Sequence, residues 1–233
     1  RLSLVGSEMC IRDRVRSHVP DIIVSDVMMP RMNGYKLCKT IKEDINISHI
    51  PVILLTARDD RQSQISGYKN GADGYLSKPF EVEMLMELIR NRLKNREYTK
   101  KRYLNAGLIP TPEESTISLT DETFLIKLNS IIQENIENSN LGIQFICQEV
   151  GLGRSSLYNK LKALTGMGAN EYISKLRIEK AITLISGTDM PFSEIAEKTG
   201  FTTPSYFSTA FKQYTGETPS QYKERKKKGL ADK

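Results

Sequence analysis

The 233-residue sequence has no long apolar run and few cysteines. Without an apolar stretch of about 20 residues, we expect neither a membrane-spanning helix nor a signal peptide, and no membrane contact by this chain. Cys10, Cys38 and Cys147 are odd in number and form no C-x-x-C pair, which argues against a disulfide framework or a zinc site. His18 and His49 have no catalytic partners and are expected at the surface or at helix ends. These absences favour a cytoplasmic protein that is not a metabolic enzyme and takes no small-molecule substrate.

Positive charge is in modest excess and unevenly placed. The formal net charge is +6, and lysine and arginine concentrate in residues 90–102 and 223–228. A polyanionic partner fits this distribution, but such short runs are more often a solvated linker or tail. Motifs therefore have to decide whether the chain binds nucleic acid.

Short apolar runs alternate with helical patterns in the first half of the chain. The expected strands are 21–26, 51–57 and 74–80, and the expected helices are 34–44, 61–72 and about 81–95. The strands are continuously apolar, as parallel strands covered on both faces are. We therefore predict a doubly wound α/β domain.

The sequence changes character at about residue 98. Residues 98–120 contain Pro110 and Pro112 and few apolar side chains, so we interpret them as a linker. A helix capped by Thr120 follows, and its apolar face carries Phe124, Leu128, Ile131 and Ile132. Residues 146–166 and 195–216 then repeat one pattern of helix, glycine turn and second helix, which predicts two helix-turn-helix units.

Three polar residues each end an expected strand: Asp26, Thr56 and Lys78. Because parallel strands share one carboxyl edge, these side chains should converge there. A carboxylate can act as a nucleophile toward a phosphoryl group, and a hydroxyl and an ammonium can bind the phosphoryl oxygens. The trio predicts a phosphoacceptor site.

The segments "SDVMMPRMNG", "LLTA" and "KPF" resemble the receiver domains of two-component systems, with a flavodoxin-like fold. The resemblance implies that Asp26 is the phosphoacceptor, that Thr56 and Lys78 assist it, and that Lys78–Pro79 is a cis peptide. Met28 would offer its backbone carbonyl to Mg²⁺. Tyr75 would be the switch aromatic, with an ordinary strand tyrosine as the alternative.

The receiver pattern is incomplete before residue 21. Complete receivers begin with a strand that ends in an acid pair, which binds Mg²⁺ beside the phosphoacceptor, and nothing upstream supplies it. Residues 3–14, "SLVGSEMCIRDR", can all be back-translated in one frame to a sequencing-library adapter. We therefore expect residues 1–14 to be non-native, against the alternative of a natural variable terminus, and residues 15–97 to be a truncated receiver. Such a receiver should leave Ile22 and Val24 along an unpaired edge, fold poorly and be phosphorylated weakly.

The second half resembles the DNA-binding domain of AraC-type regulators. The segments "EVGLGRSSLYNKLKALTG" and "SEIAEKTGFTTPSYFSTAFKQYTGETPSQY" carry this resemblance, which places the domain at 121–226 and a basic tail at 227–233. Two recognition helices would enter the major groove. The residues expected to face DNA are Arg154, Ser155, Tyr158, Asn159, Lys162, Ser205, Ser208, Thr209 and Lys212. Packing is the alternative role for Tyr158, and the one favoured for Tyr206.

The fold class is therefore an incomplete α/β receiver followed by an all-α double helix-turn-helix domain. We interpret the chain as the output part of a two-component regulator that binds DNA, is controlled by a histidine kinase and forms a homodimer when active. It resembles the C-terminal end of hybrid sensors, in which the kinase lies in the same chain and the full-length protein is anchored in the inner membrane; a free-standing regulator is the alternative. A phosphotransfer component and an unphosphorylated dimerisation module are the competing functions.

Overall fold

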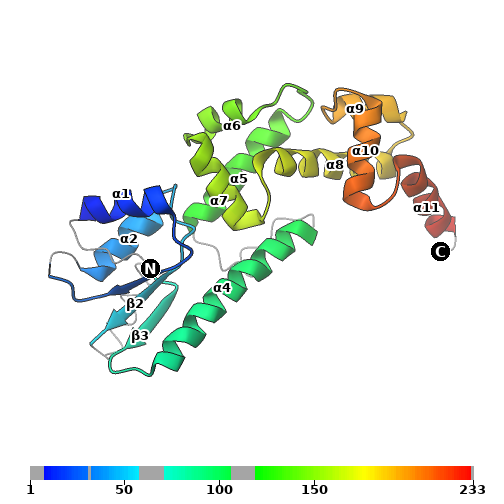
Figure 1. Cartoon of the computed structure of the whole chain (residues 1–233). Helices are drawn as coiled ribbons and strands as arrows, with labels where there is room; N and C mark the ends of the chain where they lie inside the picture. Colours follow the sequence, from blue (N-terminus) through cyan, green and yellow to red (C-terminus); the bar gives the residue numbers. More distant parts are fainter. Residues whose placement is uncertain (1–7, 31–32, 58–70, 106–118, 232–233) are drawn as a thin grey trace. The chain divides into compact units, whose positions relative to one another are not determined.

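A computed structural model of the chain describes residues 8–30, 33–57, 71–105 and 119–231 (Figure 1). The chain divides into two compact units, residues 1–125 with 159–166 and residues 126–158 with 167–233. Within the described ranges, every helix is too short or too polar to span a bilayer.

The first unit contains a parallel sheet of three strands in the order β1-β2-β3. The strands are β1 (Ile23–Asp26), β2 (Val52–Thr56) and β3 (Gly74–Ser77). Each lies inside a run that the sequence marked as a strand, so these three predictions are confirmed. The helix expected over 61–72 falls largely on residues outside the described part of the chain.

Helices pack on both faces of this sheet, because successive strand residues point to opposite sides. Helices α1 (Glu8–His18) and α2 (Gly34–Glu43) share one core with β1 and β2. Its buried side chains are Ile11, Val15, Ile23, Val27, Leu37, Cys38, Ile41, Ile47, Ile50, Val52, Leu54 and Ala72. On the other face Leu88 of helix α4 (Val82–Asn105) lies against the backbone of Gly74, next to Ile53.

Strand β1 pairs only with β2 among the described residues, and its other edge is open. Val24 is 39% exposed there, as predicted, whereas Ile22 is half-buried. Helix α1 includes residues of the segment predicted to be non-native, and Ile11 of that segment is buried. The origin of the segment stays a prediction.

Helix α4 continues to Asn105, ten residues beyond the expected end. The prediction that the linker begins at residue 98 is therefore wrong. Residues 96–105, "REYTKKRYLN", lack glycine and proline, and their arginines and lysines are good helix formers. The two prolines on which the linker prediction rested, Pro110 and Pro112, lie beyond the end of this helix.

The second unit consists of helices joined by turns, with no strand among its described residues. Its elements are the greater part of α5 (Leu119–Glu134), α6 (Ile143–Val150), part of α7 (Arg154–Thr165), α8 (Ala169–Gly187), α9 (Phe192–Lys198), α10 (Pro204–Thr215) and α11 (Pro219–Ala231). One predicted cap is wrong: Thr120 is the second residue of α5, and its hydroxyl donates to the carbonyl of Lys42 at 3.0 Å. Helix α11 continues through Ala231, into the expected basic tail.

The two predicted helix-turn-helix units share their local geometry. Gly151 and Gly200 both have φ +72° where the first helix of each pair ends, a left-handed conformation that glycine adopts without strain. A buried apolar residue follows each glycine, Leu152 in one unit and Phe201 in the other. These matched turns support the predicted duplication.

Candidate functional site

Asp26, Thr56 and Lys78 lie at the carboxyl edge of the sheet. Asp26 and Thr56 end β1 and β2, and Lys78 directly follows β3. The strand register pairs Asp26 with Leu55 and Thr56 with Ser77, so the strands end at nearly the same level. The structure thus gathers the three residues at one edge, where open α/β sheets bind ligands.

Two donors hold the Asp26 carboxylate. Nζ of Lys78 donates to Oδ2 in an ion pair, and the backbone N of Met28 donates to Oδ1 at 3.1 Å. The backbone N of Lys78 donates to the carbonyl of Thr56 at 2.6 Å, which ties the lysine to β2. The Lys78–Pro79 peptide is cis, as predicted. The Asp26 side chain is 35% exposed and therefore accessible to solvent.

The surroundings of Asp26 favour its ionised form. Burial by itself raises the pKa of the carboxyl, but the hydrogen bonds from Lys78 and Met28 and the charge of Lys78 outweigh burial and lower the pKa below its usual value. The carboxylate is therefore unprotonated at neutral pH, as a nucleophile has to be.

Gly34 shapes the loop that follows Asp26. A Cβ at residue 34 would lie 2.3 Å from the carbonyl oxygen of Asp26, so only glycine fits this close approach. The backbone N of Gly34 also donates to the carbonyl of Val27 at 2.9 Å. Asn33 then caps α2 by accepting a hydrogen bond from the N of Tyr35. Gly34 and Asn33 thus hold the start of α2 close to Asp26 and Val27.

Thr56, expected to assist the phosphoacceptor, and Tyr75, the expected switch residue, are less exposed than Asp26. The Thr56 side chain is buried, with only 2% of the residue exposed. Tyr75 is half-buried in β3 and packs against the core that α1 and α2 share with the sheet. Its hydroxyl lies 3.4 Å from that of Tyr35, a neighbour that the sequence did not suggest. Whether Tyr75 acts as a switch stays a prediction.

The described residues do not fit a magnesium site. Among them, no group of three or more histidine, cysteine, aspartate or glutamate side chains could hold a metal ion. Asp26 and the carbonyl of Met28 are too few ligands for Mg²⁺, which requires near-octahedral oxygen coordination. Both Asp26 oxygens already accept protein hydrogen bonds.

Helix α7 presents a polar face that matches the predicted DNA-reading residues. Leu157, Leu161 and Leu164 are buried, as predicted. The predicted reading residues are exposed or, for Asn159, half-buried: Arg154, Ser155, Tyr158, Asn159 and Lys162. Tyr158 is 54% exposed, which favours a role at the surface over packing.

Helix α10 is arranged in the same way. Thr203 caps it by accepting a hydrogen bond from the N of Tyr206 at 3.1 Å. Phe207 and Phe211 are fully buried beneath it in a chain of aromatic contacts with Phe201 and Tyr222. The predicted reading residues are exposed or, for Ser208, half-buried: Ser205, Ser208, Thr209 and Lys212.

Tyr206 differs from its expected role. It was expected to pack, yet it is 53% exposed while its ring meets Phe201 edge-on, with centroids 5.7 Å apart. The ring therefore packs on one edge and faces solvent with the rest.

Two residues are buried against expectation. Lys160 of α7 is completely buried, although a helical lysine flanked by outward-facing residues is usually solvated. His49 was expected at the surface or at a helix end, but it is only 7% exposed in the loop before β2. No local pattern marked either residue, because the charged groups around them come from distant segments. His18 does end a helix, as expected, but its Nδ1 lies 2.7 Å from Oγ of Ser17, so it is not without a partner.

Comparison with known proteins identifies both halves of the chain. The family described as "Response regulator receiver domain" matches residues 4–90, and that described as "Helix-turn-helix domain" matches residues 146–225. The chain is 42% identical over 210 residues to histidine kinase P4 of Formosa agariphila, an alignment that covers 90% of this chain and 15% of the kinase.

In two further comparisons this chain covers a larger share of the other protein. The probable transcriptional regulator ycf29 of Pyropia yezoensis is 30% identical over 162 residues, or 65% of this chain and 73% of the regulator. The C-terminal domain of AraT, a response regulator from Geobacillus stearothermophilus, is 31% identical, covers 44% of this chain and 84% of the solved one, and has a TM-score of 0.42. The chain belongs to the response regulators, with a receiver domain followed by an AraC-type helix-turn-helix domain.

Proposed function

We propose that the chain is a sequence-specific DNA-binding transcription regulator controlled by phosphorylation of Asp26. The observation that carries this proposal is the ion pair between Lys78 and the Asp26 carboxylate at the carboxyl edge of the sheet, in one chain with two helix-turn-helix units. The chain spans 15% of the length of the histidine kinase that it resembles. A kinase in the same full-length chain is therefore part of the proposal.

The residues at the sheet edge suit phosphoryl transfer from a phosphohistidine. One oxygen of Asp26 would attack phosphorus and form the P–O bond, while the P–N bond breaks and its electron pair returns to the imidazole. Lys78 already forms an ion pair with the carboxylate. Its ammonium group would move to a phosphoryl oxygen as negative charge develops on that oxygen. Thr56 would donate its hydroxyl to a second phosphoryl oxygen. Mg²⁺ would take part only where further carboxylates join Asp26.

The exposed faces of α7 and α10 suit the major groove of DNA. Asn159 can bond adenine through two hydrogen bonds, and the hydroxyls of Ser205 and Thr209 can meet base edges or phosphates. Lys162 and Lys212 can neutralise phosphates. Helix α8, with 19 residues, lies between the two helix-turn-helix units in the sequence.

DNA binding is tested with a duplex that the chain selects from a random library. We expect affinity to fall steeply with salt, and Lys162→Met to reduce the slope of log K against log salt by about 1. Lys127→Met, which removes an exposed lysine of α5, is the matched control and should leave the slope unchanged. Equal affinity for selected and scrambled duplexes would refute sequence-specific reading.

Control by phosphorylation is tested with Asp26→Asn in cells that carry a reporter behind the selected duplex. We expect the variant to lose the response to the kinase, while Glu83→Gln, an exposed acid in the first turn of α4, keeps it. A normal response from Asp26→Asn would favour the dimerisation module. Rapid transfer of the phosphoryl group onward to a histidine protein would favour the phosphotransfer component.

The hybrid origin of the chain is tested by one long sequencing read across the genomic locus. A reading frame that continues upstream through an acid-pair strand to a kinase and membrane spans would support the hybrid sensor. A start codon just before a complete receiver would support a free-standing regulator. A natural gene that encodes residues 1–14 would refute their adapter origin.

A further inference from the structure

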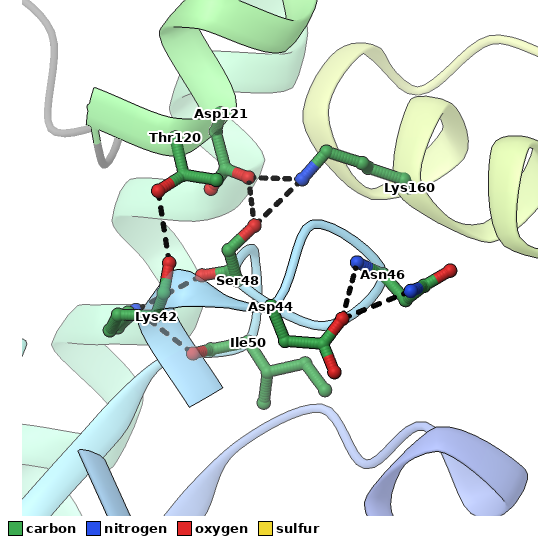
Figure 2. Close-up of polar contacts among 8 residues, drawn as sticks. All are labelled: Lys42, Asp44, Asn46, Ser48, Ile50, Thr120, Asp121 and Lys160. Carbon is green, nitrogen blue, oxygen red and sulfur yellow. Dashed lines mark hydrogen bonds and ion pairs between the residues drawn. The ribbon is translucent and has the colours of Figure 1, made fainter. Parts of the chain in front are cut away.

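Ser48, Asp121 and Lys160 form a buried polar cluster within the first unit, which we call the clasp (Figure 2). Nζ of Lys160 donates to Oγ of Ser48 at 2.8 Å and forms an ion pair with Oδ1 of Asp121. Oγ of Ser48 donates to the same Oδ1 at 2.7 Å. Each of the three side chains therefore contacts both others.

The clasp joins three segments that are far apart in the sequence. Ser48 belongs to the loop of residues 44–50 between α2 and β2, Asp121 to the first turn of α5, and Lys160 to α7. Thr120, beside Asp121, adds the hydrogen bond from its hydroxyl to the carbonyl of Lys42. The clasp thus ties a receiver loop to a helix of the matched helix-turn-helix domain.

Both charges of the clasp are withdrawn from water. The side chains of Lys160 and Asp121 are 0% and 4% exposed. Burial lowers the pKa of Lys160, whereas the charge and the hydrogen bond of Asp121 raise it. Nζ of Lys160 also lies 5.0 Å from the centre of the Phe124 ring. Such a pair is stable only while it is closed, since separating the partners leaves a buried charge uncompensated.

Lys160, the clasp residue on α7, lies on the side of the helix opposite to the exposed face of α7. Lys160 is two residues from both Tyr158 and Lys162, a separation of about 200° around a helix. Tyr158 and Lys162 are exposed while the clasp is closed. The clasp therefore leaves the predicted reading face uncovered and instead fixes the rotation of α7.

The loop that carries Ser48 is fastened to the part of the sheet that ends at Thr56. Nζ of Lys42 donates to the carbonyls of Ser48 at 3.2 Å and Ile50 at 3.0 Å, and pairs with Oδ2 of Asp73 at 2.8 Å. Strand β2 begins two residues after Ile50 and ends at Thr56. A displacement of β2 would therefore be passed to Ser48.

We propose that the clasp is a coupling device, through which the state of the receiver sets the orientation of the first DNA-reading helix. This inference rests on the proposed function for its biological meaning, because it assumes that α7 reads DNA. It requires the loop of residues 44–50 and helix α7 to open together, as one cooperative unit.

The mechanical part of the inference is tested by hydrogen exchange of the full chain without DNA. We expect Lys160→Met to speed amide exchange in residues 44–50, 119–125 and 159–166 together, on the order of tenfold. Lys162→Met is the matched control from the same helix and should change none of the three. Faster exchange in 159–166 alone would overturn the proposal.

A double-mutant cycle guards against simple misfolding. Ser48→Ala removes one hydroxyl and should give a smaller change in the same three segments. In the double variant Asp121→Asn with Lys160→Met, amide exchange in the three segments should speed up by less than the sum of the two single effects. The reason is that no buried charge is left without a partner. Strict additivity would show that the two residues do not act as a pair and would overturn the proposal.

The functional part is tested by adding the selected duplex. Because coupling between two sites is reciprocal, DNA bound to the wild-type chain should change exchange in residues 44–50, and Lys160→Met should abolish that change while the duplex still binds. Binding without any response in wild-type residues 44–50 would refute the coupling. Failure of the wild-type chain to bind any duplex would instead refute the proposed function. The exchange results without DNA would in that case still test whether the clasp opens as one unit.

Discussion

His49 should make the stability of the first unit depend on pH. It follows Ser48 in the loop before β2, and only 7% of the residue is exposed. Burial, and next the positive charge of Lys160, lower the pKa of the imidazole to about 3, against the opposing charge of Asp121. The charges of Arg96 and Lys42 lower the pKa further. His49 is therefore neutral in the folded chain at physiological pH.

The size of the effect follows from the difference between the folded and unfolded pKa values. The unfolded imidazole titrates near pH 6.5, so between that pH and about 3 the unfolded chain binds a proton that the folded chain does not. The free energy of unfolding consequently falls as the pH falls through this window, by about 1.4 kcal/mol per pH unit. Lowering the pH from 7 to 5 should cost about 2 kcal/mol, and raising it above 7 should change nothing through this group.

The assay is urea unfolding at pH 7 and at pH 5. Unfolding is monitored through hydrogen exchange of residues in β2, so that the first unit is observed by itself. We expect His49→Gln to remove most of the pH dependence, whatever it does to stability at pH 7. His18→Gln, the other histidine of the chain, is the control and should keep it. If the wild-type chain and His49→Gln lose equal stability between pH 7 and pH 5, the reasoning is refuted.

Three further predictions concern single residues. Gly200→Ala should lower the free energy of unfolding by about 3 kcal/mol or more, since its Cβ would lie 2.2 Å from the carbonyl oxygen of Ile136. Gly151→Ala, at the same φ and with no atom within 4 Å, should lower it by about 1 kcal/mol. Equal losses in thermal unfolding would contradict this difference. Gly34→Ala should cost more than about 2 kcal/mol and displace the Asp26 loop, while Gly187→Ala, with free space around it, should be tolerated; circular dichroism melts compare the two. Acetyl phosphate should label Asp26 of the 233-residue chain only weakly, because the described residues contain no acid cluster for Mg²⁺, and near-normal labelling would show that the receiver functions without one.

The strands and the meeting of Asp26 with Lys78 could be predicted because local sequence determines them. An apolar run that is continuous from Val52 to Leu55 can be satisfied only inside a covered sheet, and a polar residue directly after such a run lies at the strand end. Asp26 and Lys78 therefore meet through topology alone, before any side-chain detail is known. The same holds for Leu157 and Phe207, whose helical spacing from other apolar residues marks the buried faces of α7 and α10.

Element ends were harder to predict, because competing local preferences decide them. Helix α4 passes through a basic segment that has no helix breaker, and tyrosine and lysine are compatible with either helix or linker. At the start of α5, Thr120 is a good capping residue in isolation. In the structure Thr120 lies inside α5, and its hydroxyl donates to the carbonyl of Lys42.

The clasp could not be predicted, because its partners are distant in sequence. Ser48 and Lys160 are 112 positions apart, and a lysine on an amphipathic helix has no local feature that marks it as buried. Only the packing of three segments supplies the carboxylate and hydroxyl that make its burial tolerable.

The chemistry of the clasp indicates what a buried charged pair contributes that an apolar pair would not. Replacing such a pair by well-packed apolar side chains is often neutral or stabilising, so stability alone does not account for Lys160 and Asp121. The buried leucines of α7 do not each require one specific partner. A helix with such an apolar stripe therefore tolerates small rotations. An ammonium that is completely buried has to meet its carboxylate, and in α7 one rotation satisfies that requirement. We therefore infer that the pair contributes orientation rather than stability, which is the property that a helix needs if its exposed face is to read DNA.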